Sequence, residues 1–310
     1  MVDFRKIKTV PIRRIPHQVR IADFGKVTSP GGTWAEFYDS LPGILAARDF
    51  QDLVRRIVRT RREGHPLIVG IGGHVIKCGL SPYLIDLMEK KVITALAMNG
   101  SAAIHDFEIA FAGETSEDVP SSLENGIFGM AEETVRYMNQ AFKEGLKKGW
   151  GAGEALGRFI ERKRFPHRSW SVLARGASWK IPLAVHIAIG TDTIHHHPSA
   201  SGAVLGEATF RDFRLFAGLV TRCENGGYIN IGSAVVMPEV FLKAVAVARN
   251  LGKKLDGLWT ANFDMIRGYR PMENVIKRPP GKKGRGYALT GHHEIMIPLL
   301  ARAVLEEMGR

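Results

Sequence analysis

The sequence predicts an α/β protein with one doubly wound, mostly parallel sheet. Short apolar runs alternate with segments whose apolar residues recur every three or four positions, which is the pattern of strands alternating with helices. Most of the runs end in glycine, hydroxyl or carboxylate residues, which are typical of turns from a strand into a helix. The 310 residues are 45% hydrophobic and 24% charged, so the chain can bury a large core.

Five strands account for the short apolar runs. They are Leu67–Ile71, Val92–Met98, Leu183–Ile189, Tyr228–Ile231 and Leu258–Phe263. Helices are expected over 102–111, 130–147, 210–223 and 239–251, and another opens at Ser81-Pro82. This alternation predicts a parallel sheet that is covered by helices on both faces.

Residues 1–65 are expected to form a basic arm and one helix packed on the core, and residues 66–310 the catalytic domain. The apolar residues of that helix recur at the spacing of a single face: Phe50, Leu53, Val54, Ile57 and Val58. The N-terminal segment lacks the apolar stretch of a secretory signal, and two cysteines in a chain of this length are expected to be free thiols. We therefore expect a cytoplasmic protein. No uncharged apolar stretch is long enough to predict a membrane-spanning helix.

The chain is strongly basic, with 43 Lys and Arg against 31 Asp and Glu and a net charge of +12. This balance suggests an anionic partner. The basic clusters are the N-terminal arm and residues 55–62, 161–168 and 277–285. They lie at element ends and in loops, as solvated faces do, so an acidic protein partner stays open while nucleic acid is disfavoured. Within the last cluster, 281–286 is expected to be a mobile surface loop or a lid over an anionic ligand.

The residues just after each strand are the candidate site, because ligands of open parallel sheets bind at the carboxyl ends of the strands. These segments are Gly70-Ile71-Gly72-Gly73-His74, Asn99-Gly100-Ser101, Gly190-Thr191-Asp192-Thr193, Gly232-Ser233-Ala234 and Asn262-Phe263-Asp264. Glycine lets the backbone approach a pyrophosphate, and carboxylates bind ribose hydroxyls, so five such turns together favour a dinucleotide. Each single turn also suits a helix cap. The usual G-x-G-x-x-G fingerprint is absent, because Val75 stands where its third glycine belongs.

Three segments resemble the successive nucleotide-binding segments of deoxyhypusine synthase. They read GGHVIKCGLSPYLIDLMEKKVITALAMNGSAAIHDFEIAF, HIAIGTDTIHHHP and GGYINIGSAVVMPEVFLKAVAVARNLGKKLDGLWTANFD. The resemblance covers the chain from about Gly70 to the C-terminal helix and is closer to deoxyhypusine-synthase-like proteins of bacteria and archaea. It implies a Rossmann-like fold that binds NAD, in a homotetramer with active sites at subunit interfaces. The family oxidises spermidine by hydride transfer to NAD and passes the butylamine group through a lysine imine to a protein lysine.

The resemblance also implies which residues contact the cofactor. In this sequence the corresponding residues are Asn99, Gly100, Ser101, Asp106, Thr191, Asp192, Gly232, Ser233 and Asp264, to which the first turn adds Gly72, Gly73 and His74. The family's Trp-Gly-Lys is absent, and Lys277 lies only near its expected place. Pro238-Glu239 replaces the family's paired histidines. The expected catalytic residues are thus Lys277, Glu239 and His195, which directly follows the Thr-Asp turn.

An amine substrate is also favoured on chemical grounds. Hydride removal from a carbon that bears nitrogen leaves an iminium cation, which nearby carboxylates stabilise. The candidates are Asp106, Asp192, Glu239 and Asp264. His105, Asp106 and Glu108 open a helix, where acidic residues also suit the helix dipole.

Two other classes of function stay open. His195-His196-His197 and His292-His293-Glu294 could serve a metal-dependent hydrolase, although consecutive residues cannot all reach one ion and no metal site is predicted. A non-catalytic nucleotide- or nucleic-acid-binding protein would use the basic surface instead. The sequence does not identify the substrate.

Overall fold

The computed structural model describes residues 1–310, in two compact units, Met1–Asp52 and Leu53–Arg310. The boundary falls within helix α2 (Leu45–Arg62), earlier in the chain than the expected boundary at residue 65. The first unit holds three short 3-10 turns, which are η1 (Phe4–Lys6), η2 (Ile12–Arg14) and η3 (Ile21–Asp23), and helix α1 (Trp34–Asp39). In this unit the ring of Trp34 stacks on Tyr38, with the centroids 6.4 Å apart.

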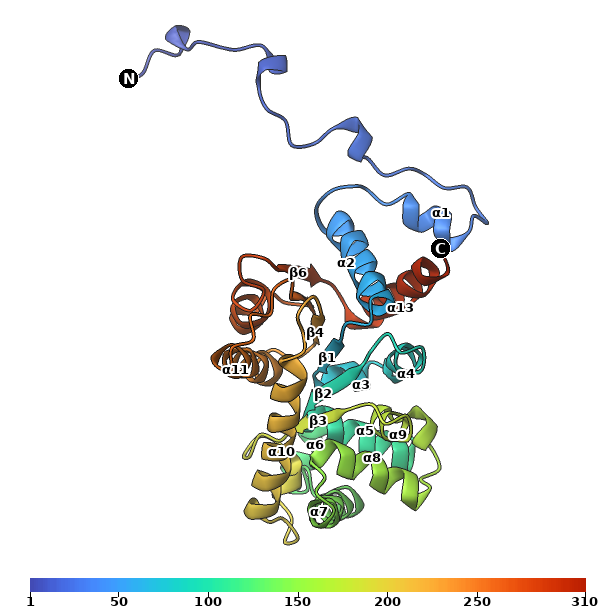
Figure 1. Cartoon of the computed structure of the whole chain (residues 1–310). Coiled ribbons are helices and arrows are strands. Elements are labelled where there is room, and N and C mark those ends of the chain that lie inside the picture. Colours follow the sequence, from blue (N-terminus) through green and yellow to red (C-terminus); the bar gives the residue numbers. More distant parts are fainter. The chain divides into compact units, whose positions relative to one another are not determined.

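Six parallel strands form one sheet in the order β3-β2-β1-β4-β5-β6 (Figure 1). The strands are β1 (Leu67–Ile71), β2 (Ala95–Asn99), β3 (Leu183–His186), β4 (Gly227–Ile231), β5 (Trp259–Asp264) and β6 (Arg285–Thr290). The predicted α/β fold with a parallel sheet is confirmed. Successive strands run outward from β1 to β3, after which β4 returns to the other side of β1, so the strand order reverses between β1 and β4.

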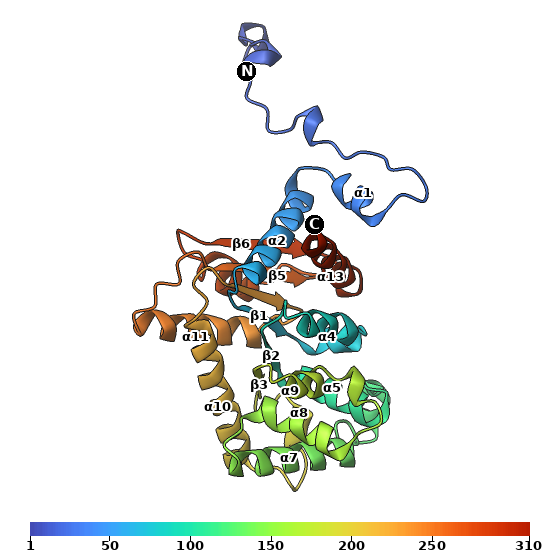
Figure 2. The ribbon, with the colours of Figure 1, turned by 45° about the vertical axis from the view of Figure 1, so that its right-hand side comes forward.

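Helices cover both faces of the sheet (Figure 2). They are α3 (Gly73–Lys77), α4 (Ser81–Glu89), α5 (Gly100–Ala112), α6 (Val119–Glu124), α7 (Glu132–Lys147), α8 (Ala152–Lys163), α9 (Val172–Ser178), α10 (Gly202–Val220), α11 (Val236–Asn250), α12 (Tyr269–Pro271) and α13 (His293–Gly309). Shorter turns are η4 (Arg168–Trp170), η5 (Thr193–His195) and the π-helical η6 (Met272–Lys277). No helix has the length and apolar character needed to cross a membrane.

The core between the sheet and helices α10 and α11 is built on aromatic packing. Tyr228 of β4 stacks on Phe241 of α11 with the ring centroids 3.8 Å apart, and both side chains are fully buried. A Cβ on Gly70 would stand 2.3 Å from the Tyr228 hydroxyl oxygen. Glycine is therefore needed at position 70 to leave room for the ring of Tyr228. This packing explains the glycine without any role in ligand binding.

The apolar face predicted for α2 is buried. Leu53, Val54, Ile57 and Val58 are at most 2% exposed. The Trp259 indole N–H also donates to the Thr60 hydroxyl, at 3.0 Å. Of its basic residues, Arg55, Arg59 and Arg62 are exposed, as expected, whereas the half-buried Arg56 donates to the hydroxyl of Tyr287 in β6 at 2.5 Å.

The prediction of a loop over 281–286 is wrong at its C-terminal end, because β6 begins at Arg285. Tyr287 and Leu289 of this edge strand are 1% and 3% exposed, whereas its end residues are exposed. A Cβ on Gly284 would stand 2.0 Å from the Leu258 carbonyl oxygen, so the turn before the strand is packed against the start of β5. The glycine in this turn therefore allows the backbone to pack closely against β5.

Candidate functional site

The turns after β1 and β4 lie against one another where the strand order reverses. A Cβ on Gly72 would stand 2.2 Å from the Gly232 carbonyl oxygen, so only glycine fits at position 72. The Gly72 N–H donates to the Ile231 carbonyl at 3.0 Å and ties the two turns together. Gly232 itself has a φ of +61°, in the left-handed region that glycine adopts without strain. Backbone rather than side chains therefore forms this part of the crevice.

The turns after β1, β2 and β3 are joined in the same way. A Cβ on Gly73 would stand 2.3 Å from the Ser101 hydroxyl oxygen, and a Cβ on Gly100 would stand 2.0 Å from Asp192 Oδ2. The glycines at the strand ends thus allow each turn to pack on the next. The structure brings the turns after β1, β2, β3 and β4 together into one continuous edge.

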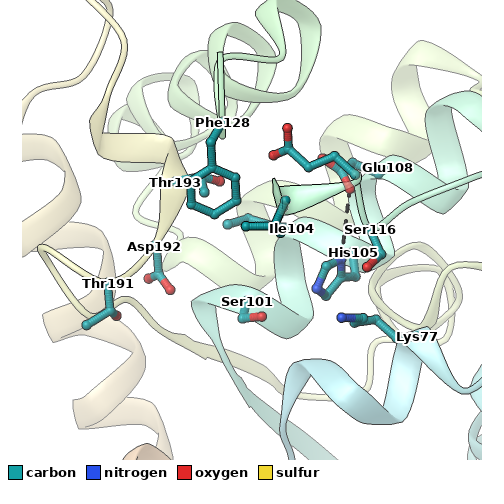
Figure 3. Close-up of a pocket in the computed structure, with 12 residues that line it drawn as sticks. Lys77, Ser101, Ile104, His105, Glu108, Ser116, Phe128, Thr191, Asp192 and Thr193 are labelled. Carbon is teal, nitrogen blue, oxygen red and sulfur yellow. Dashed lines mark ion pairs between the residues drawn. The ribbon is translucent and has the colours of Figure 1, made fainter. Parts of the chain in front are cut away.

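A pocket of about 220 Å³ opens at the β2 and β3 side of this edge (Figure 3). Its walls come from α3, α5, η5 and residues 116–128. The lining includes Lys77, Ser101, His105, Glu108, Glu117, Phe128, Thr191 and Asp192. Three carboxylates thus face this pocket against one lysine, although the whole chain is strongly basic. Such a lining favours a cationic group in the pocket.

Asp192 is a predicted site residue that lines this pocket. Its side chain accepts a hydrogen bond from the Ala188 N–H at 2.9 Å, and the residue is 6% exposed. Burial raises the pKa of this carboxyl to about 6, and the hydrogen bond from Ala188 opposes the rise. A carboxyl with a pKa in this range can exchange a proton near neutral pH.

His105 and Glu108 are joined through Thr115 on the opposite wall. His105 Nδ1 lies 2.7 Å from the Thr115 hydroxyl oxygen, and that hydroxyl donates to Glu108 Oε2 in a short hydrogen bond. Thr134 donates to the other Glu108 oxygen at 3.3 Å. Burial acts to raise the pKa of Glu108, but the hydrogen bonds from His105, Thr115 and Thr134 outweigh it, so the pKa lies below its usual value. Glu108 is therefore charged at neutral pH.

The sequence prediction omits most of the residues that line this pocket. Ser101, Thr191 and Asp192 are predicted from their strand-end turns. Lys77 and Glu117 carry no sequence signal, and the place of His105 and Glu108 near a helix start is equally well explained by the helix dipole. Only the packing of α3 and of residues 113–119 around α5 shows that they face one cavity.

Three other residues predicted to contact the cofactor accept hydrogen bonds from backbone N–H groups nearby. Asn99 Oδ1 accepts from the Ala102 N–H at 3.0 Å and caps α5, and the Ser233 hydroxyl accepts from the Met237 N–H at 3.1 Å in the first turn of α11. Asp264 Oδ1 accepts from the adjacent Met265 N–H at 2.8 Å. All three residues still lie at the strand-end edge.

Asp106 does not face the pocket. It is fully buried, and its carboxylate accepts hydrogen bonds from the Ser171 hydroxyl and from the N–H groups of Val172 and Leu173. Burial raises its pKa to about 6, against the effect of these hydrogen bonds. The structure therefore makes Asp106 the cap that fixes the start of α9 to α5, in place of the expected cofactor contact.

Lys277 is not brought to the strand-end turns. It ends η6, and its ammonium pairs with Glu273 at 2.6 Å in the solvent. The preceding residues pack on the starts of β5 and β6, since the Thr260 hydroxyl donates to the Val275 carbonyl and a Cβ on Gly286 would stand 2.2 Å from the Ile276 carbonyl oxygen. Lys277 thus lies at the opposite edge of the sheet from the candidate site.

Glu239 does lie at the strand-end edge, in the first turn of α11. Its two oxygens accept hydrogen bonds from Arg270 at 3.2 Å, from Asn274 at 3.0 Å and from Lys243. The cation of Lys243 lowers the pKa of this carboxyl, so it is charged. Glu239 joins α11 to the segment after β5, away from the pocket lining.

The histidines of the two clusters point to different places. His195 Nδ1 accepts from the Gly190 N–H at 3.2 Å, whereas His197 Nε2 lies 3.0 Å from Glu132. His293 is buried against the turn of Gly232, its ring 5.4 Å from the ring of His74 and its Nε2 3.2 Å from the Phe263 carbonyl oxygen. No group of three or more His, Cys, Asp or Glu is placed to hold a metal ion.

The sequence matches no family model and no curated protein. The fold, however, is similar to solved structures. A protein from Entamoeba histolytica, provisionally assigned as a deoxyhypusine synthase, aligns over 91% of this chain and 96% of its own at 12% identity, with a TM-score of 0.58. AgrE, solved with ornithine and NAD⁺, aligns over 86% of this chain at 13% identity and a TM-score of 0.54.

A third similar structure is ArgZ, an arginine dihydrolase from the ornithine-ammonia cycle of cyanobacteria, which aligns over 85% of this chain at 16% identity and a TM-score of 0.52. The chain spans about a third of the length of ArgZ (33%) and of AgrE (34%). The predicted resemblance to the deoxyhypusine synthase fold is therefore confirmed at the level of fold.

Proposed function

We propose that this chain is an NAD-dependent enzyme that oxidises an amine-bearing carbon, with a deoxyhypusine-synthase-like fold. The observation that carries the proposal is the acidic pocket at the carboxyl edge of the sheet, beside turns that glycine holds together. In folds with this strand order, dinucleotides bind across the point where the order reverses. A similar structure of 13% identity contains NAD⁺ and ornithine, which is an amine, and this agrees with the proposal.

The residues at the crevice between β1 and β4 fit a dinucleotide. Gly72, Gly73 and Gly232 let the neighbouring turns pack together, so the wall of the crevice that would face a dinucleotide is largely backbone. The ring of His293 lies beside Gly232 through Cε1 and Nε2, and its Nδ1 is buried without a hydrogen-bond partner, so one polar atom near this crevice is unsatisfied. We propose that these residues, with His74, Ser101 and Asp264, hold NAD.

The pocket supports an amine as the second ligand. Glu108, Glu117 and Asp192 line it, and a protonated amine is the small-molecule group that pairs with carboxylates. Bound NAD supplies a hydride acceptor, and the carboxylates then stabilise the positive charge that stays on the substrate. The pocket volume of about 220 Å³ suits a slender aliphatic amine better than a bulky one.

Transfer of an aminoalkyl group through Lys277 is not part of this proposal. Lys277 lies at the opposite edge of the sheet, so within this chain it cannot reach a substrate held at the pocket. We propose oxidation of the amine as the reaction, with release of the oxidised product. The homotetramer, the acidic protein partner and the cytoplasmic location remain predictions.

The experiment that tests the cofactor is thermal unfolding of the full chain with and without NAD. Ligand that binds only the folded state raises Tm, so NAD should stabilise the protein, and Asp192→Ala should weaken this effect through the loss of the Gly100 contact at the edge. Glu224→Ala, far along the sheet at the turn before β4, is the control and should leave the NAD effect unchanged. A folded sample that shows no stabilisation at millimolar NAD rules the cofactor out.

A further inference from the structure

His105, Thr115 and Glu108 form a hydrogen-bonded chain whose direction can be assigned. The Thr115 hydroxyl has one proton, and it donates that proton to Glu108 Oε2. It must therefore accept at its oxygen from His105 Nδ1, which lies 2.7 Å away and so carries a proton. In the neutral ring this leaves the lone pair on Nε2. This hydrogen-bonded chain, called the relay below, thus fixes the His105 tautomer in which Nε2 can accept a proton.

The free end of this relay faces the pocket. His105 lines the cavity together with Ser101 and Lys77, and its side chain is 16% exposed (Figure 3). Its Cδ2, next to Nε2 in the ring, would lie 3.2 Å from a Cβ on Gly73, so the ring stands beside the turn after β1. This places the accepting nitrogen between the glycine turns and the acidic pocket.

A charged carboxylate stands behind the ring. Glu108 Oε2 lies 3.9 Å from His105 Nδ1, and the carboxylate is also held by the Thr134 hydroxyl. A negative charge at this distance stabilises the imidazolium that forms when Nε2 gains a proton. In hydrolytic enzymes a carboxylate bonded directly to Nδ1 orients the histidine base, and here Thr115 bridges the carboxylate and the ring.

We propose that His105 is the general base of the amine oxidation, with Thr115 and Glu108 as its positioning residues. The proposal rests on the proposed function. The substrate ammonium gives one proton to His105 Nε2, which frees the nitrogen lone pair. With NAD⁺ bound, this lone pair would form the C=N bond as the adjacent carbon loses its hydride, so that the amine would be oxidised to an iminium ion and NAD⁺ would accept the hydride.

Other charged groups face the same pocket. They are Lys77 from α3 and, across the cavity, Glu117 and Asp192. Asp192 loses its charge as the pH falls below its pKa of about 6, so the decrease of the rate at low pH includes the loss of this carboxylate.

The test is the pH profile of amine-dependent NADH formation by the full chain and three variants. His105→Asn removes the base while keeping a side-chain amide near Thr115, and should lower kcat/KM at neutral pH by about 10²–10⁴-fold. The loss should shrink at high pH, where the amine is already deprotonated. Thr115→Val should lower kcat more than it changes KM, because the ring of His105 then loses the hydrogen bond that orients it, and Thr115→Ser should restore the rate.

His65→Asn is the control, since His65 precedes β1 at the other edge of the sheet, and its profile should match that of the wild type. Equal kcat/KM for His105→Asn and the wild type would overturn the role of His105 while the proposed function stands. No NADH formation by the wild type with any amine would instead overturn the proposed function and the role together. Nitrogen NMR of the histidine rings tests the relay separately, and a proton on Nε2 instead of Nδ1 would contradict it.

Discussion

Gly100 and Asp192 lie in contact across the ends of β2 and β3, because a Cβ at position 100 would stand 2.0 Å from Asp192 Oδ2. Gly100 begins α5, and Asp192 precedes η5. The two residues belong to turns that are 92 positions apart in sequence (192 − 100) and that both border the pocket. This contact sets how closely the turn after β3 packs against the turn after β2 at the pocket.

Gly100→Ala should therefore destabilise the protein and open the pocket. Forcing a methyl group into a packed site costs about 1–3 kcal/mol, and the carboxylate must move away from the Ala188 N–H. Gly206→Ala in α10 is the matched control, since a Cβ there meets nothing within 4 Å. Urea unfolding should show a loss of stability for Gly100→Ala and a gain of up to about 1 kcal/mol for the control. Equal effects of the two substitutions would contradict the contact.

Asp106 should prove to be important for stability and not for the cofactor. Asp106→Ala leaves the Ser171 hydroxyl and two backbone N–H groups buried without an acceptor, at about 1–3 kcal/mol each. Asp86→Ala, which removes an exposed pair with Lys90, should cost less than about 1 kcal/mol. Thermal unfolding measures both effects. A variant at position 106 that folds normally but loses NAD binding would contradict this assignment.

Two lysines test which edge of the sheet carries the site. Lys77 lines the pocket next to the turn after β1, where its charge suits the cofactor phosphates, whereas Lys277 pairs with Glu273 at the other edge. A hydrogen bond to a charged group contributes about 1.5–3 kcal/mol, so Lys77→Gln should weaken NAD binding by about tenfold or more. Lys277→Gln should leave the affinity unchanged. Calorimetric titration with NAD compares the two, and the reverse order would place the site elsewhere.

Stability should fall as the pH rises from about 4 to about 7. Burial raises the pKa of Asp212 from 3.8 to about 7, against hydrogen bonds to its carboxylate, and the pKa values of Asp106 and Asp192 rise to about 6. At these three carboxyls the folded state binds more protons than the unfolded state in this window, so they make the free energy of unfolding decrease as the pH rises. His186, whose pKa burial lowers to about 4, acts in the opposite sense.

Asp212→Asn should flatten this dependence, since Asn can still accept from the Gly153 and Val185 N–H groups that Asp212 Oδ2 accepts at 2.8 and 2.7 Å. Urea unfolding at a series of pH values shows the slope. An unchanged slope in Asp212→Asn would mean that this carboxyl does not titrate in the window.

The sequence predicts the sheet well because its inner strands are buried on both faces and so read as continuous apolar runs. Strand β6 is missed because it lies at the edge, where only Tyr287 and Leu289 are deeply buried and the pattern resembles a polar loop. Its start also follows glycines and lysines, which ordinarily indicate a surface turn.

The candidate site is predicted only in part, because sequence shows which residues follow a strand but not what they meet. Asp106 and Ser101 lie on the same helix, yet one is buried against Ser171 and the other faces the pocket. Lys277 lies near the expected motif position in the sequence, but the path of η6 carries it to the opposite edge. His105 becomes a candidate base only when Thr115, ten positions later, is seen to bridge it to Glu108.

The most direct measurement of the central claim is NADH formation by the purified full chain, mixed with NAD⁺ and a series of aliphatic amines of increasing length. The account predicts NADH in proportion to amine, with a preference for slender substrates and a large loss in Glu108→Gln, which removes one of the pocket carboxylates. The absence of NADH with every amine, from a folded protein that binds NAD, would contradict it.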